Sequence, residues 1–371
     1  MRSWVEVSRR QLAANFAALR AVVGPAVEVA AVVKANGYGH GAVEVARVLE
    51  GEGARWLAVA ACEEGVELRQ AGIAARILVM SDTLPENRSA FFEFGLTPVV
   101  HALEELPPLE EMARKLGREL AYHLKMDSGM GRLGTLAAPQ AVAEAVRRCT
   151  HLRLEGFMSH LASAGDYSSA QTDEQVRAYA AWREQLRALG VTARYTHLAA
   201  TVPIAYGRRE AFANMVRPGL SVYGYIPPAR GAAPERILQV RPALAWKARL
   251  VAVKEVPAGA PIGYGAHFRA PHAMRIGLVA AGYADGVRYS LANRGQVIAA
   301  GRLVPMLGAV SMDLTAIDLT GCPALAAGDA VTLLGREGDV SLDAEQIASA
   351  AGTISYDVLC GMGRRVERVY L

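Results

Sequence analysis

Eight short apolar runs alternate with helical patterns between Glu28 and Gly219, and this alternation limits the possible folds more than any other feature. Patterns such as EEGVELRQAG and PQAVAEAVRRC separate most of the runs. Strands that alternate with helices form βαβ units and a parallel sheet, and eight such units fit a closed (β/α)8 barrel of the TIM type. An open, doubly wound sheet is the alternative, but its GxGxxG motif is absent after the early strands. The runs lie at residues 28–35, 56–61, 76–82, 96–101, 120–129, 152–161, 193–199 and 214–219.

The character of the sequence changes after the eighth run. Residues 226–241, IPPARGAAPERILQVR, are rich in proline, alanine and arginine and predict a connector. Beyond them, short strand-like segments are separated by glycine and proline turns. One helical pattern, SLDAEQIASAAG, begins with Ser341, which together with a nearby acid resembles a capping arrangement. We therefore expect an α/β protein with a TIM-type barrel over residues 8–230 and a mostly β C-terminal domain over residues 231–371. Residues 1–7 could pair with the second domain.

Composition excludes several classes of protein. The chain has 371 residues and a formal net charge of +4 at pH 7, and its acidic and basic side chains are interspersed, which does not indicate a nucleic-acid partner. No apolar stretch resembles a signal peptide or reaches the length of a membrane span. The four cysteines, Cys62, Cys149, Cys322 and Cys360, show no CxxC spacing, so we expect neither disulfides nor a metal site. A reducing cytoplasm is the expected setting.

The stretch from Val29 to Gly41, VAAVVKANGYGHG, joins an apolar run to a lysine and a glycine-rich loop. A lysine at the end of a buried strand is costly to bury unless it is used. A desolvated amine loses proton affinity, and the neutral amine of Lys34 could form a Schiff base with an aldehyde cofactor. Tyr38 offers a hydroxyl group in the same loop. The alternative is a lysine whose ammonium group reaches solvent over a polar turn.

Several chemically active side chains fall at the C-terminal ends of the predicted strands. In a (β/α)8 barrel these ends and the loops that follow them build the active site. A single histidine there is more often structural than catalytic, so the shared location is what indicates a site. The residues are Lys34, Lys125, Asp127, Arg132, His160, His197, Thr201, Arg217 and Gly219.

The segment DSGMGRLG, residues 127–134, places Arg132 in a glycine-rich loop after the fifth run. Its glycines could mark only a tight turn. A guanidinium with five fixed donors, however, suits a carboxylate, phosphate or phenolate oxygen. Lys125 on the same strand could orient Arg132 only if its own charge were removed or reversed, which a covalent modification could do.

Two turns in the second domain also carry polar groups next to apolar strands. GYADG places Tyr283 at the end of one strand, and VSMD places Met312 and Asp313 beside another. Because Asp-Gly is a strong turn dipeptide, the residues of GYADG taken alone indicate a β-turn.

Taken in order, six motifs resemble the pyridoxal-phosphate-dependent alanine racemases. The motifs are VVKANGYGHG, KMDSGMGRLG, VRPGLSVYG, GYADG, SMD and TISYDVLC. GYADG or VRPGL alone would be unspecific, whereas the ordered set spans nearly the whole chain and is highly specific. The resemblance implies a barrel that binds pyridoxal 5'-phosphate, a C-terminal β domain, and a homodimer with shared active sites.

The resemblance also implies roles for single positions. Lys34 would hold the cofactor as an internal aldimine and act as one base, and Tyr283 of the partner subunit would act as the other base on the opposite face of the substrate. His160 would lie beside the cofactor ring, and Arg217 would face the pyridine nitrogen. The phosphate would be held by Tyr38, Thr201, Gly219, Leu220 and Tyr356.

Three further positions complete the implied site. Arg132 would bond the phenolic oxygen of the cofactor and bind substrate, and the Met312 backbone amide would meet the substrate carboxylate. Lys125 matches a lysine that is carbamylated in many relatives, and a carbamate is an anion that could face Arg132 without repulsion.

The implied chemistry is racemisation with two bases. Pyridoxal phosphate takes up the electrons released when the substrate Cα–H bond breaks. The Arg217 guanidinium has no readily lost proton, so it disfavours a long-lived carbanion that side reactions could consume. Two bases on opposite faces allow a proton to leave on one side and return on the other, which inverts the stereocentre.

The sequence departs from the family pattern in three places. It has Ala200–Thr201 where relatives usually have Asn-Ser, and Gly308–Ala309 where relatives usually have Gly-Arg. The acid in the loop after His160 is shifted by one position. These changes concern substrate access and side-chain preference more than the type of reaction.

We therefore expect a cytoplasmic, homodimeric alanine racemase that interconverts L- and D-alanine and supplies D-alanine for peptidoglycan. A racemase of serine or of a broader range of amino acids is the alternative, motivated by Ala200 and Ala309. A non-catalytic pyridoxal-phosphate-binding homeostasis protein would typically be a single barrel, so the second domain argues against it. A decarboxylase of the same fold type matches less well.

Overall fold

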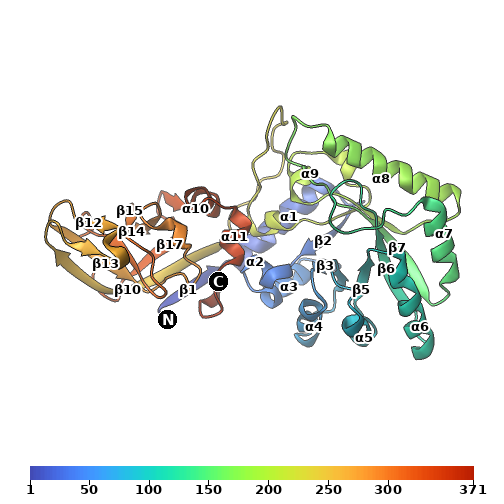
Figure 1. The fold of residues 1–371 in the computed structure, drawn as a ribbon, viewed down its shortest axis with the longest axis horizontal. Helices are drawn as coiled ribbons and strands as arrows, with labels where there is room; N and C mark the ends of the chain where they lie inside the picture. Colours follow the sequence, from blue (N-terminus) through green and yellow to red (C-terminus); the bar gives the residue numbers. More distant parts are fainter. The chain divides into compact units, whose positions relative to one another are not determined.

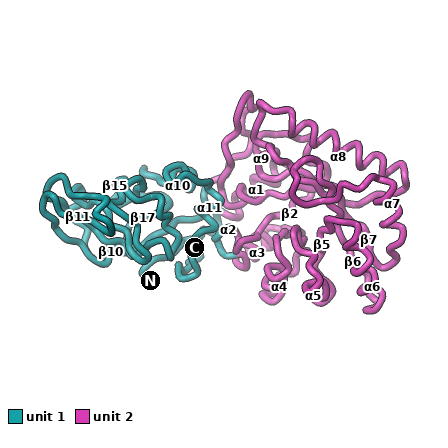
Figure 2. The backbone as a smooth tube through the Cα atoms, in the orientation of Figure 1, with its two compact units in different colours: residues 1–11, 38–41, 242–371 teal, residues 12–37, 42–241 magenta.

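The computed structural model describes residues 1–371, and the chain divides into two compact units (Figure 2). The barrel unit consists of residues 12–37 and 42–241. The β unit consists of residues 1–11, 38–41 and 242–371. The division therefore follows residue 241, later in the chain than the expected domain limit at residue 230.

Eight parallel strands close into a barrel in the barrel unit, which confirms the predicted (β/α)8 fold. The ladder closes where Glu28 of the first barrel strand pairs with Met215 of the last. Strands such as WLAV are buried along their whole length, as expected when helices cover the outer face and side chains fill the interior. The strands are β2 (Glu28–Val32), β3 (Trp56–Val59), β4 (Arg76–Val79), β5 (Thr97–Val100), β6 (Leu120–Lys125), β7 (Leu152–Met158), β8 (Tyr195–His197) and β9 (Met215–Val216).

Each observed barrel strand is shorter than its apolar run. Residues at the C-terminal end of a run leave the ladder and enter the following loop, so Lys34 lies beyond the end of β2 and His160 lies beyond the end of β7. This shortening places the predicted chemical residues in the loops where a barrel builds its site.

Helices surround the barrel strands in Figure 1. The helix α6 shows why they do so, because Leu106, Leu109 and Ala113 are buried on one face, and Gly117 ends the helix with φ of 61°. The helices are α1 (Arg9–Val23), α2 (Lys34–Tyr38), α3 (Ala42–Gly51), α4 (Cys62–Gln70), α5 (Arg88–Glu93), α6 (Leu106–Leu116), α7 (Pro139–Arg148), α8 (Gln171–Ala188) and α9 (Thr201–Ala205), with 3-10 turns η1 (Pro85–Asn87), η2 (Leu103–Glu105), η3 (Arg209–Ala211) and η4 (Leu220–Tyr223). None of the helices combines the length and the apolarity that spanning a membrane requires.

The β unit is built on a nine-stranded sheet with the order β18-β17-β14-β15-β16-β13-β10-β1-β19, which confirms the mostly β character of the C-terminal part. The first strand of the chain lies between β10 and β19, antiparallel to one and parallel to the other. The strands are β1 (Ser3–Val7), β10 (Leu244–Val256), β11 (Pro261–Ile262), β12 (Phe268–Arg269), β13 (Met274–Val279), β14 (Gln296–Ala299), β15 (Arg302–Leu307), β16 (Thr315–Asp318), β17 (Ala330–Glu337), β18 (Val340–Leu342) and β19 (Glu367–Tyr370). The helical segments are α10 (Ala344–Ala351), α11 (Ser355–Cys360), η5 (Tyr264–Ala266) and η6 (Tyr289–Leu291).

The cap of α10 differs from the expectation. Asp343 is the N-cap, because its Oδ1 accepts a hydrogen bond from the Gln346 amide at 2.9 Å, while the Gln346 side chain accepts from the Asp343 amide at 2.8 Å. Ser341 cannot serve as the cap because it lies in β18, where it pairs with Arg336. The expected capping role of Ser341 was therefore wrong.

Candidate active site

Lys34 follows β2 and begins a turn with an unusual backbone. Ala35 and Asn36 both have φ of 51°, and Gly37 has φ of 60°, so three successive residues are left-handed. This conformation costs about 1 kcal/mol or more for each residue other than glycine. Residues in strained backbone persist only when their surroundings hold them, and such residues gather at functional sites.

Hydrogen bonds from the surrounding barrel unit hold this turn. The Glu64 carboxylate accepts from the Ala35 amide at 2.6 Å, and its other oxygen accepts from the Ala60 amide at 2.8 Å. The Asn36 side chain accepts from the Ala42 amide at 2.9 Å. Glu64 gives no signal in the sequence, since a glutamate in the first turn of α4 looks like an ordinary helix-terminal acid.

Lys125 ends β6 and is almost fully buried. Burial, the largest cause, and the positive charges of Arg217 and Arg132 together lower the pKa of its amine to about 8, although the Asp127 charge acts in the opposite direction. No carboxylate lies within ion-pair distance of Lys125. Much of this amine is therefore neutral just above physiological pH, which an unburied lysine would not be.

Asp127 organises the glycine-rich loop that carries Arg132. Its carboxylate accepts from the backbone amides of Gly129, Met130 and Gly131 at 2.9, 2.8 and 2.9 Å. Burial alone would raise the pKa of Asp127, but these donors lower it overall. The Arg132 side chain itself is exposed.

Arg217 is fully enclosed in the barrel and heads a chain of buried histidines. One of its Nη atoms donates to His197 Nδ1 at 2.5 Å, and the other donates to the Ser159 carbonyl at 2.7 Å. His197 Nε2 lies 2.7 Å from His123 Nδ1. Because a guanidinium can only donate, His197 must carry its proton on Nε2 and donate it to His123. His123 was not predicted as a site residue, because its place within an apolar strand gives no signal in the sequence.

These buried groups remain in defined charge states. Burial lowers the pKa of Arg217 to about 10, so the guanidinium stays protonated at neutral pH. Burial also lowers the pKa of His123 to about 3, and it lowers the pKa of His197 in the same direction, with the Arg217 charge adding to the effect on both rings. The two imidazoles are therefore neutral, and Arg217 is the charged member of this hydrogen-bonded series.

His160 lies among cations at the mouth of the barrel. Burial is the largest cause that lowers its pKa, to about 3, and the neighbouring positive charges add to it. Those charges are Arg217, Lys125, Arg132 and Lys34. His160 is therefore a neutral ring at physiological pH, and its surroundings favour an anionic ligand.

Thr201 links the predicted phosphate-binding positions. Its hydroxyl accepts from the amides of Gly219 and Ser221, both at 3.2 Å, and bonds the Ser221 hydroxyl at 3.1 Å. The Leu220 amide opens η4, where the first backbone donors of a helical turn lack partners within the turn. The Thr201 hydroxyl therefore holds the loop after β9 in place by accepting from two of its amides.

Tyr38 and Tyr356 meet within the β unit. Their ring centroids are 6.1 Å apart, although their positions in the chain are distant. Burial raises the pKa of Tyr356 to about 12, and the Glu345 charge adds to this effect. Tyr356 is therefore a neutral phenol that can donate a hydrogen bond.

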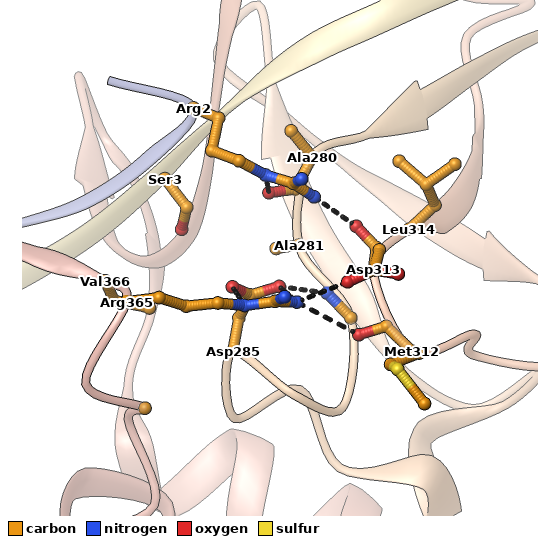
Figure 3. A network of polar contacts seen from close by, with 12 residues as sticks. Arg2, Ser3, Ala280, Ala281, Asp285, Met312, Asp313, Leu314, Arg365 and Val366 are labelled. Carbon is orange, nitrogen blue, oxygen red and sulfur yellow. Dashed lines mark hydrogen bonds and ion pairs between the residues drawn. The ribbon is translucent and has the colours of Figure 1, made fainter.

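Tyr283 and Met312 lie in two adjoining turns of the β unit, which are joined by backbone hydrogen bonds. Figure 3 shows Asp285 of the first turn and Met312 of the second. The Tyr283 amide donates to the Ser311 carbonyl at 3.0 Å, and the Ala284 amide donates to the Met312 carbonyl at 3.1 Å. The side chains of Tyr283 and Met312 are 46% and 53% exposed, which is high for residues of their size. GYADG is thus a turn, as its residues indicate, and the turn presents its tyrosine outward.

The structure groups the predicted residues within each unit. The barrel unit brings together Lys34, Lys125, Arg132, His160, Thr201, Arg217, Gly219 and Leu220 around the C-terminal ends of its strands. The β unit carries Tyr38, Tyr283, Met312 and Tyr356.

Comparison with known proteins decides the family. Sequence models of the alanine racemase N-terminal and C-terminal domains match residues 7–227 and 243–370. This chain belongs to the alanine racemase family. The alanine racemase of Symbiobacterium thermophilum is 39% identical over 369 residues, which cover 99% of this chain and 97% of that protein.

Solved structures of alanine racemases share the whole fold. The enzyme from D-cycloserine-producing Streptomyces lavendulae has a TM-score of 0.93 and 33% identity, and the match covers 100% of this chain and 97% of that one. The alanine racemase of Bartonella henselae, solved with covalently bound pyridoxal phosphate, has a TM-score of 0.89 and 25% identity, with 100% of both chains covered. Alanine racemases are pyridoxal-phosphate-dependent isomerases of amino acids, so this chain is an amino-acid isomerase.

Proposed function

We propose that the chain interconverts L- and D-alanine with two bases, Lys34 and Tyr283 of the partner subunit, and supplies D-alanine for bacterial peptidoglycan in the cytoplasm. The observation that carries this proposal is the cluster of cations around a neutral His160 at the end of β7, next to a lysine on a strained turn. Full-length similarity to alanine racemases supports alanine as the substrate.

The residues of the barrel unit fit pyridoxal 5'-phosphate. The cofactor carries an aldehyde, a phosphate and a phenolic oxygen, and the barrel offers an amine on Lys34, the Leu220 amide at the start of η4 and a guanidinium on Arg132. When bound, pyridoxal phosphate supplies an electron sink for the electrons released at the substrate Cα. Within the barrel unit, we assign the phosphate to Thr201, Gly219 and Leu220.

Arg217 sets the electronic character of this site. Its charge is fixed because His197 accepts a hydrogen bond from it and cannot take its proton at neutral pH. A guanidinium placed at the pyridine nitrogen donates a hydrogen bond without giving up a proton. With the cofactor bound, Arg217 would in this way limit how much negative charge the ring nitrogen draws and would favour rapid return of a proton to the substrate.

Racemisation needs a proton donor and acceptor on each face of the substrate. Lys34 would serve one face, and Tyr283 of the partner subunit would serve the other. The 46% exposure of Tyr283 suits a base that acts outside its own chain. The Met312 backbone amide and the Arg132 guanidinium would bind the substrate carboxylate and so fix which face each base meets.

Lys125 is proposed to carry a carbamate. The neutral amine would attack carbon dioxide, a new N–C bond would form, and the amine would release one proton. The lowered pKa of Lys125, about 8, raises the fraction of amine that can react. The resulting anion could pair with Arg132, which removes the repulsion between the two cations.

The first test replaces the lysine of the strained turn. Purified wild-type protein should contain pyridoxal phosphate, detected by its absorbance in the near-ultraviolet and visible range, and should racemise both enantiomers of alanine. Lys34→Ala should abolish covalent attachment and lower the racemisation rate by several orders of magnitude, because one base is lost. Lys115→Ala, a change at an exposed lysine on α6, is the matched control and should retain both properties. Wild-type protein that neither binds the cofactor nor racemises any amino acid would rule out the proposal.

A second substrate range is favoured by one local observation. Ala309 replaces the arginine that relatives usually carry, and it is buried against the backbone of Gly263. The absence of this arginine, which changes substrate access, is what favours serine or a broader range of amino acids. A panel of enantiopure amino acids distinguishes the alternatives, and a rate for alanine far above all others would exclude the broader range.

A further inference from the structure

The turns that carry Tyr283 and Met312 are fastened to each other through their backbones. Besides the two hydrogen bonds from Tyr283 and Ala284, close packing leaves no room at Gly282, where a Cβ atom would lie 2.3 Å from the Ser311 carbonyl oxygen. The two turns are therefore in direct backbone contact, and their relative position depends on the side chains that hold each of them.

Asp285 anchors the first turn from inside. It is 1% exposed, and one carboxylate oxygen accepts from the Gly282 amide at 2.8 Å. A buried carboxylate is costly unless a cation and further donors satisfy it. Arg365 supplies both, because its Nε lies 2.6 Å from one oxygen of Asp285 and its Nη2 lies 3.0 Å from the other.

The same guanidinium also reaches the second turn. Nη2 of Arg365 lies 2.7 Å from the Asp313 carboxylate and 3.3 Å from the Met312 carbonyl oxygen. Arg2 supports this turn from the other side, with Nη2 donating to the Asp313 carbonyl oxygen at 2.6 Å (Figure 3). Arg365 belongs to neither turn, since it lies between α11 and β19. The side chain of Arg365 thus contacts both turns from a third segment of the chain.

The geometry requires arginine rather than any cation. The planar fork of a guanidinium satisfies both oxygens of one carboxylate and still directs a third donor elsewhere. A lysine ammonium could neutralise Asp285, but as a point charge it would not match the two oxygens and the second turn together.

We propose that Arg365 is a positioning residue for the Tyr283 base, setting the place of the Tyr283 hydroxyl relative to the Met312 amide and thereby controlling proton transfer on one face of the substrate. This inference rests on the proposed two-base function. Arg365 acts through the two turns and does not itself touch the substrate. Loss of Arg365 should therefore impair the Tyr283 face and spare the Lys34 face.

The test measures exchange of the alanine Cα hydrogen with deuterated solvent, starting separately from L- and from D-alanine. Each enantiomer presents its Cα hydrogen to only one of the two bases, so Tyr283→Phe identifies which enantiomer depends on the tyrosine. Arg365→Ala should slow exchange from that same enantiomer by about tenfold or more, because small misplacements of a catalytic group have large effects on rate. Exchange from the other enantiomer should stay within about twofold of the wild type.

Two further variants separate positioning from general damage. Arg365→Lys keeps a cation beside Asp285 and should give a smaller, intermediate loss on the same enantiomer. Arg364→Ala alters the adjacent exposed arginine and should change neither rate. The bound cofactor's absorbance should be the same in all of these variants, because Arg365 contacts no residue assigned to the cofactor.

A readout without cofactor completes the test. In the protein freed of pyridoxal phosphate, the amides of Tyr283 and Ala284 should exchange with deuterium faster in Arg365→Ala than in the wild type, since their hydrogen bonds to the second turn loosen. Equal loss of Cα exchange from both enantiomers, or no loss from either, would overturn the role of Arg365. Wild-type protein without racemase activity would instead overturn the underlying function.

Discussion

At the scale of single residues, burial has different effects on the protonation of two cations at the mouth of the barrel. Lys125 and Arg217 are both enclosed, yet the lysine comes close to losing its proton while the arginine keeps it. The difference follows from their ordinary pKa values, because a similar desolvation shifts an amine into the neutral range and leaves a guanidinium charged. Lys125 is therefore the residue suited to modification, and Arg217 is the residue suited to hold a fixed charge.

The lowered pKa of Lys125 predicts a dependence of stability on pH. The folded protein releases the Lys125 proton at about pH 8, whereas the unfolded chain keeps it up to the ordinary value of 10.5. Between these values the unfolded state binds more protons, so the free energy of unfolding should rise with pH. Below about pH 8 both states are protonated, and the unfavourable burial of the charge is present in full.

The measurement compares wild type with Lys125→Met by urea unfolding in buffers freed of carbon dioxide. The stability of the wild type relative to Lys125→Met should increase as the pH rises from about 8 to 10.5. The comparison cancels the titration of other groups near Lys125, among them Asp127, His101 and His160. A stability difference that stays constant over this interval would show that the Lys125 pKa is not lowered in the folded protein.

At the scale of elements, the turn after β2 is held by contacts distant from it in sequence. Three consecutive left-handed residues would not persist in an isolated peptide, and the Glu64 carboxylate bonds the first of them. Because the same carboxylate also accepts from the Ala60 and Ala61 amides, it joins the loop after β3 to the loop after β2. The position of Lys34 therefore depends on α4.

Replacement of Glu64 by glutamine should release this turn. One of the two accepting oxygens becomes an NH2 group that faces a backbone N–H, so the free energy of unfolding should fall by about 1–3 kcal/mol. Covalent retention of pyridoxal phosphate should weaken as well, because Lys34 loses its fixed backbone. Thermal unfolding and cofactor release on dialysis measure the two effects.

The neighbouring position provides the control. Glu63→Gln changes an exposed glutamate of the same helix turn that makes only a 3.5 Å contact to Asn87, so its unfolding should match the wild type. If Glu64→Gln and Glu63→Gln behaved alike, the carboxylate would have no role in holding the turn.

At the scale of the whole molecule, each chain carries both proposed bases, but in different units. Lys34 belongs to the barrel unit and Tyr283 to the β unit. In a dimer with shared sites, a site takes its lysine from one chain and its tyrosine from the other. In a mixed dimer, each replacement therefore removes a base from only one of the two sites.

Mixing two inactive variants should therefore restore activity. In a mixed dimer of Lys34→Ala and Tyr283→Phe, one site has both bases and the other has neither. After full subunit exchange of equal amounts, about one quarter of all sites should be intact. Racemisation of alanine is the readout, and distinguishable affinity tags confirm that mixed dimers have formed. Mixed dimers without activity would contradict a site shared between subunits.

The sequence indicated the barrel because strand and helix periods alternate in a regular order. This order can be recognised without knowing how the side chains pack. It also indicated Lys34, Lys125, Arg132, His160 and Arg217, because each stands at the end of an apolar run, where a barrel places its loops. The ends of the strands were less certain in sequence, since apolar residues continue into the loops that leave the sheet.

Other parts of the candidate site left no readable trace in the sequence. Glu64 looks like a helix-terminal acid, and Arg365 looks like one basic residue of an exposed pair. Their partners, Ala35 for Glu64 and Asp285 for Arg365, lie far from them along the chain. Whether a charged side chain faces solvent or satisfies a buried group depends on distances that periodicity and composition do not encode.

The sequence by itself therefore determined the type of fold, the alternation of strands and helices in the barrel, and the family to which the chain belongs. Only the tertiary structure decided how the reactive residues are held: the left-handed turn at Lys34, the His197–Arg217 pair and the arginine that joins the Tyr283 and Met312 turns. The physical reason is that local backbone preference and hydrophobic pattern act between near neighbours in the chain. Charge states and hydrogen-bond geometry, in contrast, are set by groups that only folding brings together.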